Sequence, residues 1–494
     1  MKKKFKKMAV AVMALATAFP AQAQYLRSSY FMEGTSSRIQ LNPGLQPTRG
    51  YFAIPVIGSL NVSANSNTLG VRDVIDVFKD DSDFFMNNTL YDRLKTDNNL
   101  NINLNTDILS FGWLKGRNFW NVNVGVRMDV GARVNKGMFD FMREVNGAPI
   151  DDLLGTERSY DMGNQKVRMS TYGEVGLGFS RRLTEKLTVG GKVKVLLGLA
   201  RAELNIHQFD VDMELPDYPA SGGDFTQEDW MGKGYSYKAK GNVVTTMSGG
   251  GITFDNQGMI EDFEFDVDDL GLAGAGFGVD FGVSYELLNN LTLSASVLDL
   301  GFLKWKKSET RMGTVDANEQ TVIDYSNYDK FIGGDFLSLE RFNFQEQRNV
   351  DYKSKTRLSS TLILAAEYAF FKKKLSVGAM YSAHFVQPKA LHDVTLSATY
   401  RPRNWFNVAA SYSPVLAGGK SMGLALKLGP VFLGTDYMYF GNNSKSVNGF
   451  LGVAFPLGQK KKGFNLYYSY LVKIAKPKKF PAQGNAIFAS QSYS

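Results

Sequence analysis

The stretch Val122-Asn123-Val124-Gly125-Val126-Arg127-Met128-Asp129-Val130-Gly131-Ala132-Arg133-Val134 alternates between apolar residues and residues that are polar or glycine. Successive side chains of a β-strand point to opposite faces, so this pattern predicts a strand with one apolar and one wet face. Its thirteen residues exceed the usual strand of a soluble sheet. They suffice to cross a bilayer at a tilt, which takes roughly 9 to 11 residues.

The same alternation recurs through residues 50–456 and predicts an all-β fold, a transmembrane antiparallel up-and-down β-barrel of about fourteen strands. Short turns follow the even-numbered strands, whereas long loops follow the first, third, fifth and seventh. Outer-membrane barrels have short periplasmic turns and long extracellular loops, so this rhythm places the N-terminus in the periplasm. The expected strands are about 50–64, 99–113, 122–134, 167–179, 187–197, 275–285, 291–297, 362–370, 375–385, 394–400, 406–412, 422–428, 431–440 and 447–455.

The N-terminus predicts export to the cell outer membrane. Five lysines in the first seven residues precede the apolar run Met8–Phe19 and then Ala21-Gln22-Ala23, which is the layout of a cleaved signal peptide, residues 1–23. The apolar run is shorter than a spanning helix. Residues 24–49 are rich in breaks of regular structure, and we expect them to form a short periplasmic plug segment. The chain has no cysteine, which excludes disulfides and thiolate sites.

The C-terminus, residues 457–494, contains seven lysines and no acidic residue. We interpret it as a basic periplasmic extension. The alternative is a sixteen-stranded barrel that uses residues 484–493 as its last strand. Export and the lack of a basic excess in the barrel argue against nucleic acid as a partner.

Two motifs carry a family resemblance. Leu41-Asn42-Pro43-Gly44 is similar to the Asn-Pro element at the plug-to-barrel junction of FadL-type fatty acid transporters and the related PorV proteins. Asp299-Leu300-Gly301-Phe302 resembles a segment of a Bacteroidota family of outer-membrane barrels of unknown function. The resemblance covers about residues 25–456 and leaves out the C-terminal extension. It implies a FadL-like fold in a membrane, with Asn42 and Pro43 at the plug junction.

Charged side chains on the inward phase of the strands are the candidate ligand site. One interpretation is that charges of both signs pair and fill the lumen. The other is that basic residues on neighbouring strands hold an anionic headgroup. The candidate lumen residues are Arg127, Asp129, Arg133, Lys192 and Lys194.

An acidic run in the largest loop offers a second candidate site. The acids Asp262, Glu264, Asp266 and Asp268 have the oxygen ligands that calcium prefers, although their spacing lacks the EF-hand pattern. A solvated loop strand is the competing interpretation. We therefore assign no metal site to them.

The three histidines show no metal-binding or catalytic spacing, and no nucleotide or nucleophile motif is present. We expect no enzymatic activity and no cofactor. The sequence favours passive uptake or binding of a small amphipathic or hydrophobic molecule. The alternative is a non-transporting scaffold or shuttle that binds other envelope proteins through its loops or basic extension. Outer-membrane lipids and lipopolysaccharide are the remaining expected partners.

Overall fold

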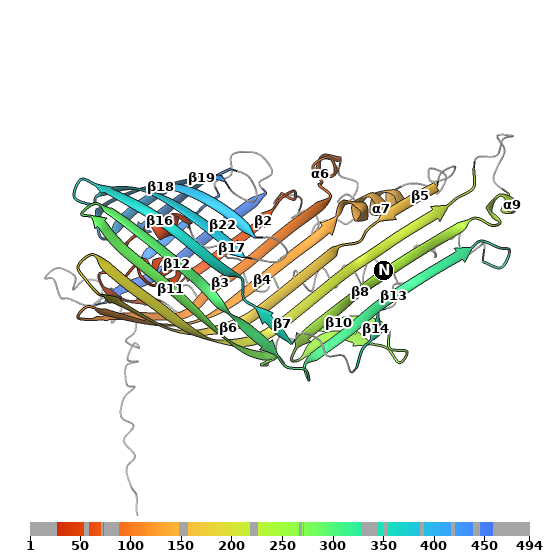
Figure 1. The fold of residues 1–494 in the computed structure, drawn as a ribbon, viewed down its shortest axis with the longest axis horizontal. Coiled ribbons are helices and arrows are strands. Elements are labelled where there is room, and N and C mark those ends of the chain that lie inside the picture. Colours follow the sequence, from red (N-terminus) through yellow and green to blue (C-terminus); the bar gives the residue numbers. More distant parts are fainter. Residues whose placement is uncertain are drawn as a thin grey trace, which may run out of the picture. The chain divides into compact units, whose positions relative to one another are not determined.

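The fold is described from a computed structural model of the chain (Figure 1). The structure describes residues 27–53, 59–70, 73, 88–147, 157–217, 226–265, 269, 271–327, 344–348, 354–385, 390–415, 420–437 and 445–457. The predicted signal peptide and almost all of the C-terminal extension lie outside these residues. Within the described part of the chain, every helix is too short or too polar to serve as a membrane-spanning helix.

Residues 50–457 form a closed antiparallel barrel of fourteen strands, as the alternation predicts. The first strand is made of β1 and β2, and the eighth of β15 and β16. The barrel closes where β2 pairs with β22 from Leu60↔Leu451 to Asn65↔Ser446, which excludes the sixteen-stranded alternative. The barrel strands are β1 (Gly50–Ala53), β2 (Ser59–Ser66), β3 (Asp97–Lys115), β4 (Asn118–Asn135), β6 (Gln165–Arg182), β7 (Leu187–Glu214), β11 (Gly274–Leu288), β12 (Leu291–Trp305), β15 (Lys355–Arg357), β16 (Ser360–Phe370), β17 (Leu375–Phe385), β18 (Leu391–Arg403), β19 (Phe406–Val415), β20 (Ser421–Leu428), β21 (Val431–Thr435) and β22 (Ser446–Leu457).

The two phases of the strands differ as expected in composition and exposure. On β4, Asn121, Asn123 and Arg127 are buried in the lumen, whereas the apolar side chains between them are only half-buried. Many large apolar side chains elsewhere on the barrel are exposed, and Val195 on β7 is 54% exposed. This outer surface is apolar over most strands, which is the surface that contact with lipid requires.

Aromatic side chains gather on the outer surface where the short turns lie. Trp113 and Trp120 stack with ring centroids 6.5 Å apart, and Trp120 lies 4.6 Å from Phe179. Tyr368 and Phe370 form a further pair, 4.8 Å apart, beside the turn after β16. Such aromatic girdles are typical of the membrane–water interface of barrels.

The sheet continues beyond the barrel on the long-loop side, where the sequence predicts only loops. Strand β7 has 28 residues, and its second half pairs with β5 (Glu157–Asp161) and β8 (Gly234–Met247). Strand β13 (Thr310–Val322) pairs with β8 along its whole length and with β14 (Gln345–Glu346) over two residues. Figure 1 shows β7, β8 and β13 running side by side past the other strands.

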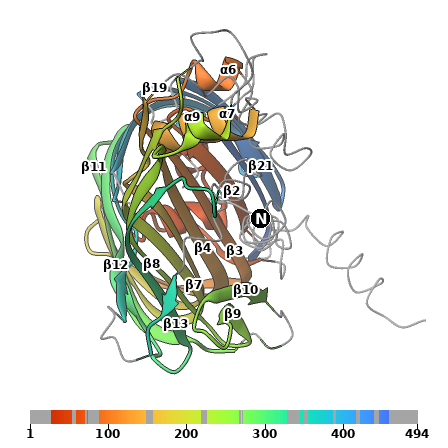
Figure 2. The ribbon, with the colours of Figure 1, turned by 90° about the vertical axis from the view of Figure 1, so that its right-hand side faces the viewer.

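This outer sheet has its own apolar core. Phe209, Trp230 and Tyr235 are buried in it together with Tyr160 and Phe141. The helices that accompany the outer sheet are α6 (Asn88–Tyr91), α7 (Lys136–Gly147) and α9 (Gln227–Trp230). The loops after the third, fifth and seventh strands therefore contribute to an ordered sheet (Figure 2).

The acidic run lies partly on a separate hairpin of β9 (Gly250–Phe254) and β10 (Ile260–Phe265). Phe263 packs against the apolar cluster around Met128 and Met169, while Glu264 is exposed. This alternation agrees with a solvated loop strand. The candidate residues Asp266 and Asp268 lie outside the described residues. Within the described ranges, no three His, Asp or Glu side chains gather closely enough to hold a metal ion.

Candidate functional site

The N-terminal segment lies inside the barrel and extends from Gln46, beside the short turn at Arg117, to Arg27, beside Asp393 and Asp436 at the opposite ends of β18 and β21. It contains α2 (Arg27–Tyr30) and α3 (Ser36–Leu41), and most of its side chains are buried. The Arg27 guanidinium forms an ion pair with Asp393 of β18 at 2.8 Å, and the Arg27 backbone N–H donates to Asp436 at 2.8 Å. The Phe31 ring lies so close to Gly378 of β17 that a Cβ atom there would collide with it. These contacts fix the segment to the barrel wall.

Asn42-Pro43-Gly44 seats the end of this segment on β7, β11 and β12. The Asn42 side-chain amide donates to the Tyr30 hydroxyl at 3.0 Å and to the Ala295 carbonyl at 3.2 Å. A Cβ atom at Gly190 would collide with the Pro43 carbonyl, and one at Gly282 would collide with Asn42. Glycine is therefore required at these two wall positions for the plug to approach so closely.

Seven charged side chains meet in the lumen next to the plug, and we call them the charge layer. The Arg127 guanidinium lies 3.1 Å from the Asp107 carboxylate and 3.3 Å from that of Glu174. The Lys192 ammonium donates to Glu174 at 2.7 Å. The layer contains three bases and four acids: Asp107, Arg127, Glu174, Lys192, Lys194, Asp280 and Asp299.

The Lys194 end of the charge layer depends on an irregularity in the barrel wall. The Lys194 ammonium contacts Asp280 at 2.8 Å and Asp299 at 2.5 Å. Asp299 has a φ of +58°, and its backbone N–H donates to Asp280 at 2.7 Å. The register of β11 and β12 shifts here, because two residues of β12 lie opposite Asp280. The Asp-Leu-Gly-Phe motif thus forms a β-bulge that turns an acid toward the lumen.

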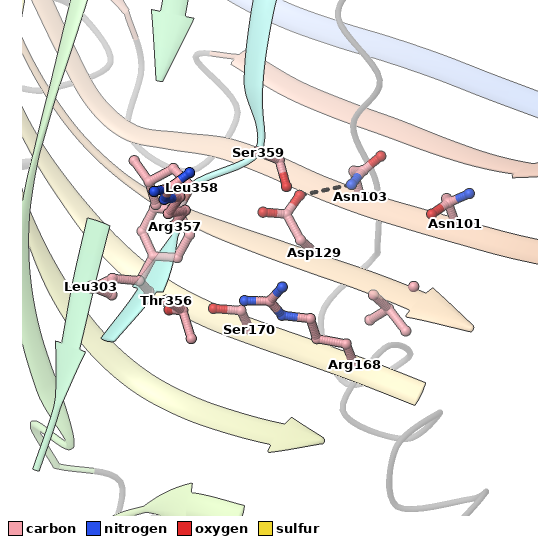
Figure 3. Close-up of a pocket in the computed structure, with 13 residues that line it drawn as sticks. Asn101, Asn103, Asp129, Arg168, Ser170, Leu303, Thr356, Arg357, Leu358 and Ser359 are labelled. Atoms are coloured by element: carbon pink, nitrogen blue, oxygen red, sulfur yellow. Dashed lines mark hydrogen bonds between the residues drawn. The ribbon is translucent and has the colours of Figure 1, made fainter. Parts of the chain in front are cut away.

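An open pocket lies beyond the charge layer, toward the long loops (Figure 3). The space within it, open solvent included, is about 500 Å³, and a second pocket, about 550 Å³ on the same measure, shares Asp129, Tyr172 and Ser359 with it. The lining comes from β3, β4 and β6 on one side and from residues 356–359 on the other. Most of the lining residues are polar: Asn101, Asn103, Asp129, Arg168, Ser170, Tyr172, Thr356, Arg357 and Ser359, with Leu303 and Leu358 as apolar neighbours.

The structure places the predicted lumen residues in two groups. Arg127, Lys192 and Lys194 belong to the charge layer, where acids neutralise them, so they do not form a basic belt. Arg133 lies apart from them toward the long-loop end, where its Nε donates to Asn99 at 3.5 Å. Asp129 lines both pockets and accepts a hydrogen bond from Asn103 at 2.7 Å.

The five candidate lumen residues include none of the four acids of the charge layer. Alternation along the strands places Glu174 and Asp280 on the lumen face, but it does not place Asp107 and Asp299 there. Asp107 lies where the register of β3 against β4 shifts, between Asp107 and Leu109. Asp299 lies in the motif that carries the family resemblance. The phase change at the first position and the motif at the second are the signals that could have pointed to them.

Outside the strands, the long-loop side has its own polar contacts. The Tyr91 hydroxyl donates to Asp140 at 2.6 Å, and this hydrogen bond raises the pKa of Tyr91 to about 12. The Lys136 ammonium and the Arg143 guanidinium lie 4.6 and 4.3 Å from the centroid of the Tyr91 ring. These contacts join α6 to α7.

The fold and the site together define a class: an antiparallel β-barrel whose lumen is filled by its own N-terminal segment and a layer of paired charges. Within that class, the chain belongs to the family of unknown function DUF5723, whose model matches residues 43–436. No curated protein sequence matches the chain.

Solved structures with a similar chain path include two transporters. The toluene transporter TbuX of Ralstonia pickettii is 11% identical, with a TM-score of 0.40 over 88% of this chain and 95% of that one. The toluene transporter TodX of P. putida is 10% identical, with a TM-score of 0.36 over 89% and 96% of the two chains. The fold itself is defined by the hydrogen-bonded register of the fourteen strands.

Proposed function

We propose that the protein is an outer-membrane barrel that binds a small molecule in its outward-facing pocket and admits it when the N-terminal segment moves. The observation that carries the proposal is the order of layers along the lumen. The pocket lies on the long-loop side of the charge layer, and the Asn42-Pro43-Gly44 end of the plug lies on its short-turn side. The exposed apolar belt and the aromatic girdle support a location in the outer membrane. The proposal involves no chemical step.

The ligand that this pocket favours has a polar part. Most lining residues carry a hydroxyl, amide or charged group, while apolar atoms contribute the larger share of the lining surface. An amphipathic ligand fits this lining better than a purely hydrophobic one, because buried polar groups of the pocket would lose their water without replacement.

The test is solute flux through the purified full-length protein in liposomes. The variant Gly190→Val places a side chain where the Pro43 carbonyl lies, and it should displace the plug and raise the flux of small solutes at least tenfold. Gly449→Val is the matched control, since a Cβ atom at Gly449 meets nothing within 4 Å. It should leave the flux at the wild-type level. If Gly190→Val folds and passes no more solute than the control, the gate is contradicted.

A scaffold that binds other envelope proteins is the second candidate. The specific observation in its favour is the outer sheet of β5, β7, β8 and β13, which has an apolar core separate from that of the barrel. The paired charges that close the lumen also agree with it. Absence of flux in every variant, together with capture of an envelope protein through the outer sheet, would favour this function over uptake.

A further inference from the structure

Two side chains of opposite charge in the open pocket, Asp129 and Arg357, lack the ion pairs that the charge layer has among the described residues. Asp129 of β4 is half-buried, and among the described residues it has no ion-pair partner within 4.0 Å. Its one hydrogen bond there, from Asn103, uses only Oδ1. Arg357 of β15 is exposed to the pocket and likewise has no ion-pair partner among the described residues. The remaining cation of the lining, Arg168, is paired with Glu203 at 3.1 Å.

The two charges come from different walls of the same pocket. Figure 3 shows Arg357 and Leu358 on one side and Asp129, bonded to Asn103, on the other. Tyr172 and Leu303 add apolar surface to the lining. The pocket therefore offers an acceptor for a cation, a donor for an anion and an apolar surface to one ligand.

We propose that this pocket binds a small zwitterion, with its ammonium group on Asp129 and its carboxylate on Arg357. A free amino acid or a short peptide has both groups on one small molecule, so it can reach both walls of the pocket at once. The Arg357 guanidinium can hold a carboxylate through two parallel hydrogen bonds. A hydrocarbon can satisfy neither charge, and a neutral sugar offers hydroxyl hydrogen bonds but no counter-charge. The inference rests on the proposed function and names its ligand class.

The experiment is a calorimetric titration of the full-length protein in detergent with glycylglycine. Two analogues each lack one charge: N-acetylglycylglycine has no ammonium, and glycylglycine amide has no carboxylate. We expect glycylglycine to bind and each analogue to bind at least about tenfold more weakly, because a hydrogen bond between charged groups is lost.

Two variants assign the charges to their partners. Asp129→Asn keeps the shape of the side chain and its bond to Asn103, and it should weaken glycylglycine about tenfold without further weakening N-acetylglycylglycine. Arg357→Gln should weaken glycylglycine about tenfold without further weakening glycylglycine amide. Asp316→Asn and Arg348→Gln remove exposed charges outside the pocket and should change nothing.

Several outcomes would overturn the inference: no binding of glycylglycine, equal binding of all three compounds, or glycylglycine binding by either variant as tight as that of the wild-type protein. Because the titration needs no opening of the plug, these outcomes do not depend on flux. If glycylglycine fails to bind while Gly190→Val still opens the barrel, the ligand class is wrong and the proposed function stands. If glycylglycine binds and no variant passes solute, the gate fails and the binding site stands.

Discussion

At the scale of single residues, the lumen separates charges that neutralise one another from charges that do not. The Glu174 carboxylate forms ion pairs with three bases: Arg127 and Lys192 are in close contact with it, and Lys194 lies 3.9 Å away. A buried ion pair contributes little net stability, but removing one partner leaves buried charge without compensation. The charge layer is therefore sensitive to the loss of its central acid.

The substitution Glu174→Gln should destabilise the barrel strongly. It keeps the size of the side chain and leaves Arg127, Lys192 and Lys194 with fewer acids, which should cost roughly 3 to 5 kcal/mol. Urea unfolding of the protein in lipid vesicles measures the change in the free energy of unfolding. Glu264→Gln is the control, because Glu264 is exposed on β10. Equal stability of the two variants would contradict the charge layer as described.

The sequence identifies most of these inward charges but not how they pair. Alternation along each strand reveals the lumen face, and it places Arg127, Lys192 and Lys194 there. Which acid pairs with which base depends on the register between strands and on bulges, such as the one that turns Asp299 inward. A left-handed backbone conformation at an aspartate is not evident from a pattern of apolar residues, because the pattern reports faces and not backbone angles.

At the scale of elements, all fourteen barrel strands are predicted, while the outer sheet is not. The barrel strands can be predicted because lipid on one side and water on the other impose a two-residue period on the sequence. Strands β8 and β13 lie beyond the barrel and bury side chains of mixed polarity against a small core. Their sequences resemble polar loops for this reason. The expected strand at 431–440 is observed over Val431–Thr435, and residues 438–440 lie outside the described part.

The outward phase of a barrel strand gives a direct test of the apolar belt. Val195→Arg puts a charge on the outer face of β7, where it should cost about 2 to 4 kcal/mol in a bilayer. Val322→Arg is the matched control, because Val322 is 50% exposed on β13, outside the barrel. Folding yield in lipid vesicles, measured by heat-modifiable migration on a gel, should fall only for Val195→Arg. Equal yields would remove the argument for lipid contact.

At the scale of the whole barrel, the proposed function requires that the N-terminal segment closes the lumen from inside. Ion pairs, hydrogen bonds and glycine contacts hold it against strands far apart in the sequence. The Asn-Pro-Gly motif predicts a plug junction, and in the structure this motif packs against Gly190 of β7 and Gly282 of β11. What the sequence leaves open is how deeply the segment lies within the barrel, because burial of a polar segment leaves no periodic signal.

The absence of native cysteine allows a direct measurement of this claim. Ser37 is buried in α3, whereas Val322 is exposed. The variant Ser37→Cys, folded in liposomes, is treated with a membrane-impermeant maleimide, and Val322→Cys is the accessible control. We expect Val322→Cys to react within minutes and Ser37→Cys to react at least about a hundredfold more slowly until the barrel is unfolded or Gly190→Val is added. Labelling of Ser37→Cys as fast as Val322→Cys in the folded barrel would contradict a lumen closed by the N-terminal segment.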